Sequence, residues 1–133
     1  MSRLQWMFLA LIITQAAHSI EEYRGRLYDV FLPARLLSEA ISQDRERGFV
    51  TVNLTLVAFG LWCFFWPVRQ RWPGAIGFVW LWVGIELMNG LGHQAWSIIQ
   101  GGYTPGVATA PVLFVIALSL AYQLRRNRDS EPL

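Results

Sequence analysis

A histidine and two adjacent carboxylates lie close together near the start of the chain, in the sequence His18-Ser19-Ile20-Glu21-Glu22. On a helix, His18 faces the same way as Glu21 and Glu22, which follow it by three and four residues. Residues 4–17 carry no charge, so these side chains come at the end of an apolar segment. Ionisable groups at the edge of a membrane-sized segment are costly unless they are paired, hydrated or bound to a ligand. We therefore place a candidate functional site here.

A second polar stripe lies in the apolar segment 74–99, whose only charged residue is Glu86. Its polar residues recur at a spacing that places them on one face of a helix: Glu86, Asn89 and His93. The first segment has a matching stripe: Gln15, His18, Ser19 and Glu22. At 1.5 Å per residue, Gln15 and Glu86 both lie about 16–18 Å from the same end of their helices, so the two stripes are expected to meet. Asn53 and Tyr103 are expected near the same depth.

The rest of the chain is unusually apolar. It has 133 residues, of which 54% are hydrophobic and 15% are charged. Apart from Glu86, charges are absent from residues 4–20, 49–66, 74–99 and 104–124. Each segment is long enough, or nearly so, to cross about 30 Å of hydrocarbon as a helix. We predict an all-α integral-membrane four-helix bundle that forms one domain over residues 1–124, followed by a short polar cytoplasmic tail over residues 125–133.

The connections around these segments carry their own signals. Residues 24–47 are too polar to span a membrane, but their apolar residues recur at roughly helical spacing. This pattern predicts an interfacial amphipathic helix between the first two spans, bent at Pro33. Near the other end of the chain, we expect Thr104 to cap the fourth helix, Pro105 to take its first position and Pro111 to bend it.

The basic residues indicate an orientation. The chain has arginines but no lysine, and they flank the apolar segments instead of forming a nucleic-acid-binding patch. A four-span topology puts six of them on one side: Arg3, Arg69, Arg71, Arg125, Arg126 and Arg128. By the positive-inside rule we predict that both termini are cytoplasmic, in a bacterial-type inner or plasma membrane. The expected partners are membrane lipid and an apolar small molecule, with no nucleic acid, and the sequence sets no oligomeric state.

The order of these motifs resembles that of a known family. His18-Ser19-Ile20-Glu21-Glu22 is similar to the signature of the HXXEE domain family, whose pattern also includes a further histidine and a Tyr-x-Pro-Gly motif. His93 and Tyr103-Thr104-Pro105-Gly106 match these two elements. The resemblance extends from His18 through the fourth apolar segment. It implies a small membrane protein of uncharacterised function, so it supports the site and supplies no reaction.

One hypothesis for the site is a metal centre. Its expected ligands are His18, Glu22, Glu86 and His93, with Glu21 as an alternative carboxylate. Imidazoles with carboxylates suit zinc, iron or manganese, and the soft sulfur ligands that copper(I) prefers are missing. Such a divalent transition metal would activate water or polarise an apolar or lipid-like substrate.

Two other hypotheses remain open. In a metal-free acid–base or ligand-binding site, Glu86 and Glu21 are the catalytic candidates, and the bound molecule is contacted by Gln15, Asn53, Asn89 and Tyr103. In a structural protein, the same polar side chains fix how the helices pack, and no reaction takes place.

Overall fold

Every regular element of the part that this computed structural model describes, residues 1–129, is helical. The long helices are α1 (Arg3–Arg24), α4 (Arg45–Cys63), α5 (Ala75–Gln100) and α6 (Ala110–Asp129). The short helices α2 (Leu27–Val30) and α3 (Leu32–Ile41) connect α1 to α4, and a π-helical turn, η1 (Phe64–Val68), extends α4. The prediction of an all-α chain is confirmed.

The helix ends follow local capping chemistry. At the start of α1, the Ser2 hydroxyl accepts from the Gln5 backbone N–H (3.2 Å), and the Gln5 side chain accepts from the Ser2 N–H (2.9 Å). Asp44 caps α4 through a bond from the Arg47 N–H. These contacts satisfy backbone donors that have no partner within the helix.

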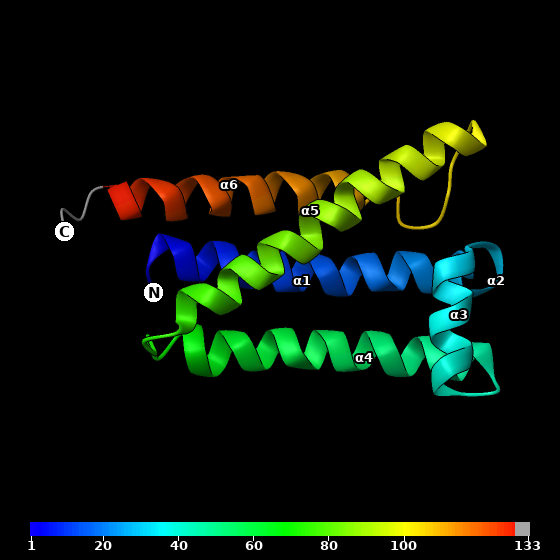
Figure 1. Ribbon diagram of the computed structural model, residues 1–133, viewed down its shortest axis with the longest axis horizontal. Coiled ribbons are helices and arrows are strands. Elements are labelled where there is room, and N and C mark those ends of the chain that lie inside the picture. The colour runs from blue at the N-terminus through cyan, green and yellow to red at the C-terminus, as the bar shows by residue number, and fades with distance from the viewer. Residues whose placement is uncertain (130–133) are drawn as a thin grey trace.

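The long helices alternate in direction, so that both ends of the described chain lie at one end of the molecule (Figure 1). Helix α1 packs against α6 on one side and α4 on the other, and α5 crosses them diagonally to reach α6. The helices α2 and α3 lie across the opposite end, with α3 nearly perpendicular to α1 and α4 (Figure 1). Consequently α1 and α5 run in the same direction, which brings their matching stripes to the same depth.

Within residues 1–129, two stretches are long and apolar enough to cross a membrane: Arg45–Val68, formed by α4 with η1, and Ala75–Gln100. A four-span bundle therefore stays a prediction for α1 and α6. In α1 the hydropathy is lowered by inward-facing polar residues such as Gln5, Gln15 and His18. In α6 the apolar part is short because the helix starts late.

The expected start of the fourth helix at Thr104 was wrong, because α6 begins at Ala110. Gly106 has a φ of +96°, a conformation that cannot continue a right-handed helix. Residues 104–109 instead form a turn. Pro111 lies in the first turn of α6, where its missing N–H removes no helical hydrogen bond, so it is not the mid-helix kink we expected.

The helical connection is confirmed, with a different break point. The chain turns at Phe31 between α2 and α3, and Pro33 lies in the first turn of α3. The apolar side chains of α3 face outward, each more than half exposed: Leu32, Leu36, Leu37 and Ile41. Of the predicted tail, residues 125–129 continue α6 and residues 130–133 lie outside the described part of the chain.

Two hydrophobic clusters enclose the middle of the molecule. The larger one, nearer the termini, joins Phe8 and Leu11 of α1 to Trp82 of α5 and Leu113 of α6. The smaller one joins Leu27 and Tyr28 of α2 to Phe49 of α4. The polar stripes of α1 and α5 lie between these clusters.

Gly48 provides a test of how α3 is seated on α4. A Cβ at this position would lie 2.1 Å from the Ser38 carbonyl oxygen, whereas a Cβ at Gly84 would meet nothing within 4 Å. We expect Gly48→Ala to lower the free energy of unfolding by about 1–3 kcal/mol, because backbone must shift. Gly84→Ala, the matched control, should be neutral or stabilising by up to about 1 kcal/mol. Thermal unfolding in detergent compares them, and equal stability would show that α3 does not pack as described.

Candidate metal centre

The inward faces of α1 and α5 each change from apolar to polar along the helix. In α1 the buried stripe runs through Phe8, Leu11, Ile12, Gln15, His18, Ser19 and Glu22. In α5 it runs through Val79, Trp82, Val83, Glu86, Gly90 and His93. The apolar halves pack together in the larger hydrophobic cluster. Because the two helices run in the same direction, that packing aligns the polar halves as well.

Three of the buried polar side chains converge on one point: His18, Glu22 and His93. Each offers a ligand atom, and these atoms all lie within 4.8 Å of one another. Glu22 Oε1 is 3.2 Å from His18 Nε2 and 3.0 Å from His93 Nε2. The two imidazole rings meet edge to face, with centroids 4.7 Å apart. We call these three residues the His–Glu–His cluster.

Glu21 does not join this cluster, because it binds the turn before α6. Its carboxylate accepts bonds from the backbone N–H groups of Gly106 (2.9 Å), Ala108 (3.1 Å) and Thr109 (2.9 Å). It also accepts from the hydroxyls of Tyr103 (2.8 Å) and Thr109 (2.7 Å). Burial raises the pKa of Glu21, but the hydrogen bonds from Thr109, Tyr103 and Ala108 outweigh it and lower this pKa to about 2. Glu21 is therefore ionised and only accepts hydrogen bonds.

The ionised Glu21 fixes the proton on His18. Thr109 Oγ1 lies 2.7 Å from both Glu21 Oε1 and His18 Nδ1. The hydroxyl proton must go to the carboxylate, which has none to give, so Thr109 Oγ1 accepts the Nδ1–H of His18. We infer that neutral His18 is protonated on Nδ1 and presents the lone pair of Nε2 to the cluster. A hydrogen bond of this kind is how proteins orient metal-binding histidines.

His18 Nε2 lacks a hydrogen-bond partner in the cluster. It is buried and makes no hydrogen bond, although Glu22 Oε1 is only 3.2 Å away. A lone pair and an ionised oxygen at this separation repel each other unless a proton or a cation lies between them. His93 differs, because its Nε2 can donate to Glu22 Oε1 while its buried Nδ1 lacks a partner. The cluster thus needs a positive charge between these atoms, which either a proton on His18 or a bound cation would supply.

The turn before α6 covers the two imidazoles. A Cβ at Gly106 would lie 2.4 Å from His93 Cε1 and 2.9 Å from His18 Cε1. Only glycine lets the backbone approach this closely, and the positive φ at this position also favours it. These two constraints explain why the Tyr-x-Pro-Gly motif has glycine at this position, where the backbone covers the cluster on the side of α6.

Glu86 is fully buried and lies in a separate group of amides. Asn89 Nδ2 donates to Glu86 Oε2 at 3.1 Å. With its amide turned so that the nitrogen faces Glu86, Gln15 donates to both carboxylate oxygens at 3.0 Å and its oxygen meets the Ser19 hydroxyl at 3.1 Å. Ser19 Oγ also lies 2.7 Å from Asn53 Oδ1. A polar network thus runs from Glu86 to Asn53, next to the cluster.

The predicted site residues accordingly fall into three groups. Three of them form the His–Glu–His cluster: His18, Glu22 and His93. Four belong to the polar network described above, which we call the amide network: Glu86, Gln15, Asn89 and Asn53. Glu21 and Tyr103 form the anchor of the turn, and Tyr103 is 67% exposed. Their roles in metal binding, catalysis and ligand binding remain predictions. Thr109 was not among the residues predicted from the sequence, although a hydroxyl residue three positions after the Tyr-x-Pro-Gly motif and directly before a helix was a usable signal.

The cluster fits a first-row metal ion in composition and in the spacing of Glu22 from each histidine. Ligand atoms about 2.1 Å from a metal lie roughly 3.0–3.4 Å from one another, and the two Glu22–histidine separations are 3.0 and 3.2 Å. Two histidines with one carboxylate also occur as a ligand set of catalytic zinc and of non-haem iron. His18, Glu22 and His93 could therefore hold a metal.

Comparison with known proteins identifies a family for this chain. Residues 6–121 match a family described as a protein of unknown function with HXXEE motif. No curated protein and no solved structure matches the chain. The matched region includes both histidines of the cluster, the Glu21 anchor and the turn that closes over them. Since the match covers most of the chain, this protein belongs to the HXXEE family.

Proposed function

We propose that this protein is an integral-membrane, metal-binding protein whose His–Glu–His cluster holds one divalent transition ion. The observation that carries the proposal is the buried Nε2 of His18, which faces an ionised Glu22 without a hydrogen bond. A cation between these atoms and His93 Nε2 would satisfy all three. Zinc, iron and manganese suit imidazole and carboxylate donors.

The outward faces of the helices support a membrane location. The most apolar stretches of Arg45–Val68 and Ala75–Gln100 are each only 28% buried within the protein. Core helices of soluble proteins are mostly buried, so these helices expose apolar surface that needs another covering. Met88, Ile98 and Ile99 of α5 are each 78% exposed, whereas Glu86 and His93 face inward. Membrane-spanning helices typically have apolar residues facing outward and ionisable residues facing the interior of the bundle.

We further propose that the metal serves a reaction on an apolar or lipid-like substrate. Three protein ligands leave at least one coordination position open, as in catalytic zinc sites. A bound metal would supply Lewis acidity or an activated water. At the depth of the cluster, a groove of about 440 Å³ between α1 and α4 is lined mainly by apolar residues such as Ile20, Phe49 and Leu54, and by none of the cluster residues. Its polar residues, Ser19 and Asn53, connect through Gln15 to Glu86.

Metal-free acid–base chemistry is the alternative, and the buried Glu86 favours it. No cation neutralises this carboxylate in the described part of the chain, and its hydrogen-bond partners there are the amides of Asn89 and Gln15. Such a group can act as a general acid or base, and the hydrogen bonds of Gln15 and Ser19 connect it to the wall of the groove. In that case a proton on His18, and not a metal, would lie between Nε2 and Glu22.

Two buried glutamates give a matched test of the metal. Glu22→Gln removes a carboxylate of the cluster, whereas Glu86→Gln makes the same change outside it. In protein purified without chelator, Glu22→Gln, His18→Ala and His93→Ala should each weaken metal binding by more than about 100-fold, because each removes a direct ligand. Glu86→Gln should keep its metal in elemental analysis. Loss of metal in Glu86→Gln would make Glu86 a ligand, and a wild type that stays metal-free after reconstitution would favour the acid–base alternative.

Thr109 tests whether the proton on His18 matters. Thr109→Val removes the hydroxyl that links His18 Nδ1 to Glu21 and should weaken metal binding about 10–100-fold, because it leaves the imidazole unoriented. Thr109→Ser should restore the affinity. The control is Thr14→Val, since the Thr14 hydroxyl bonds only the Ala10 carbonyl of its own helix. Titration with zinc checks these variants, and unchanged affinity in Thr109→Val would refute the orienting role.

The membrane topology can be tested separately from the metal. A reporter fused after Leu133 and one inserted at Gln43, between α3 and α4, should localise to opposite sides of the membrane. The reporter after Leu133 should be cytoplasmic, because arginines flank the helices at that end. Both reporters on one side, or release of the protein by alkaline carbonate, would contradict the proposed topology.

A further inference from the structure

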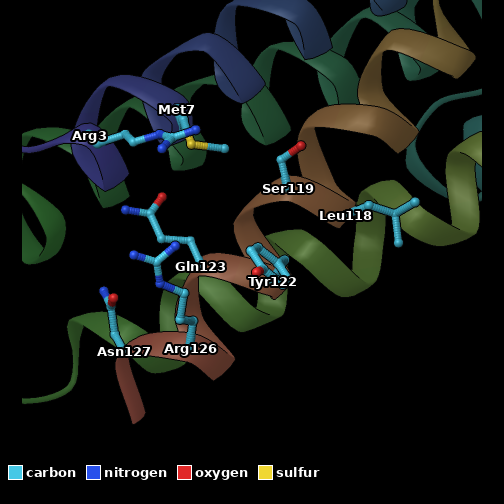
Figure 2. A pocket seen from close by; sticks show the side chains of 8 residues that line it. All are labelled: Arg3, Met7, Leu118, Ser119, Tyr122, Gln123, Arg126 and Asn127. Atoms are coloured by element: carbon cyan, nitrogen blue, oxygen red, sulfur yellow. The ribbon is translucent and has the colours of Figure 1, made fainter. Parts of the chain in front are cut away.

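Two cavities of about 440 Å³ border α1, and their walls differ in character. The cavity between α1 and α6, near the termini, mixes charged, amide and apolar side chains such as Arg3, Gln123 and Met7 (Figure 2). The groove between α1 and α4 has a mainly apolar wall, interrupted midway by Ser19 and Asn53. This groove suits an apolar molecule, and its two polar side chains can select among such molecules.

The groove is open on the outer surface of the bundle. Ile20 and Leu54 at its edges are each more than half exposed, whereas Phe49 and Ser19 are buried beneath them. In the membrane location proposed above, the groove therefore faces acyl chains. Small-molecule sites have volumes of about 300–1,000 Å³. A volume of about 440 Å³ lies in the lower half of that range and suits one aliphatic chain better than a lipid with two.

Two amide oxygens face the same hydroxyl in the wall of the groove. Asn53 Nδ2 donates to the Phe49 carbonyl at 3.0 Å, so Oδ1 is the amide atom that faces Ser19 Oγ, 2.7 Å away. Gln15 Oε1 lies 3.1 Å from the same hydroxyl when Gln15 Nε2 donates to Glu86. A serine hydroxyl has only one proton to give, so it serves one of these oxygens at a time.

The amide network is consequently short of one hydrogen-bond donor. Glu86 accepts two N–H bonds from Gln15 and one from Asn89, and such bonds stabilise a carboxylate, which has no proton to return. Whichever oxygen Ser19 serves, the other has no donor, and a buried acceptor without a donor is costly. Gln15 is fully buried, whereas Asn53 lines the groove. A molecule in the groove can therefore supply the missing donor at Asn53 Oδ1.

We propose that this groove binds a long-chain alcohol, whose hydroxyl donates to Asn53 Oδ1 while its chain lies along the apolar wall. Ser19 then donates to Gln15 Oε1, so that both amide oxygens have a donor. A hydroxyl supplies this donor without charge, whereas an ammonium would bring a costly charge into an apolar groove and an ionised fatty acid has no proton to donate. The inference rests on the apolar substrate of the proposed function and names its chemical class.

Binding of two matched ligands to the full-length protein in lipid nanodiscs tests this proposal. Dodecanol and dodecyl methyl ether have the same aliphatic chain, but only the alcohol has a hydrogen-bond donor. With each affinity corrected for partitioning into empty nanodiscs, the alcohol should bind about 3–10-fold more tightly, because one neutral hydrogen bond contributes about that factor. Equal affinities would overturn the proposal.

Variants of the two polar side chains should act in opposite directions. Asn53→Leu removes the acceptor and should abolish the preference for the alcohol. Ser19→Ala removes the internal donor, leaves Asn53 Oδ1 to the ligand and should keep or raise the preference. Ser119→Ala is the control in the other cavity, since the Ser119 hydroxyl bonds the Val115 carbonyl of its own helix. A preference that persists in Asn53→Leu, or is lost in Ser19→Ala, would overturn the role of Asn53.

Glu86→Gln tests the shortage of donors itself. The new amide can donate to Gln15 Oε1, which turns Gln15 Nε2 towards Ser19 and leaves the Ser19 hydroxyl free to donate to Asn53 Oδ1. The network then contains its own donor, so the preference for the alcohol should fall below that of the wild type. An unaltered preference would show that the shortage does not select the ligand, and it would overturn the inference.

The outcomes separate this inference from the proposed function. Asn53→Leu should keep the metal content of the wild type in elemental analysis, because Asn53 lies outside the His–Glu–His cluster. A wild type that binds metal and resists carbonate extraction but does not distinguish the alcohol from the ether would overturn the alcohol site alone. A wild type without metal that prefers the alcohol would overturn the metal centre and leave the alcohol site supported.

Discussion

The contact between Glu22 and two imidazoles is the constraint on which the rest of the structure depends. A buried carboxylate is costly without donors or a cation, so α1 must present it where His18 and His93 can both reach it. His18 lies one turn earlier on the same helix, but His93 must come from α5 at a matching depth. The parallel course of α1 and α5, together with the apolar packing of their first halves, meets that requirement.

The adjacent glutamates of the motif perform different tasks because successive helix positions face different ways. Glu22 points into the bundle towards the histidines, while Glu21 points towards the turn before α6. By binding three backbone N–H groups of that turn, Glu21 places Thr109 against His18 and Gly106 over both rings. Thr109 then links the carboxylate of Glu21 to the imidazole of His18 through two hydrogen bonds. One short motif thus supplies the carboxylate of the His–Glu–His cluster and also orients one of its histidines.

Polarity is distributed in the same way throughout the molecule. Ionisable and amide side chains meet between two apolar clusters in the interior, and large apolar side chains face outward on α3, α4 and α5. Arginines gather at the end where the chain begins and α6 ends, and two of them enter a cavity with an amide and apolar walls. Each of these features has a physical reason in a bilayer, where apolar surface is solvated and buried charge must be paired or bound.

Sequence periodicity determined the helical class and the two polar stripes, because a 3.6-residue repeat fixes which side chains share a face. It also placed Gln15 and Glu86 at one depth and predicted that the two stripes meet, since depth along helices of the same direction follows from residue counting. It could not separate Glu86 from the cluster, because that depends on side-chain reach between helices that cross at an angle. Nor could it predict that Glu21 and Tyr103 hold the turn before α6 in place, or that Thr109 links Glu21 to His18. Those contacts join residues more than 80 positions apart, and only the tertiary fold sets the turn that brings them together.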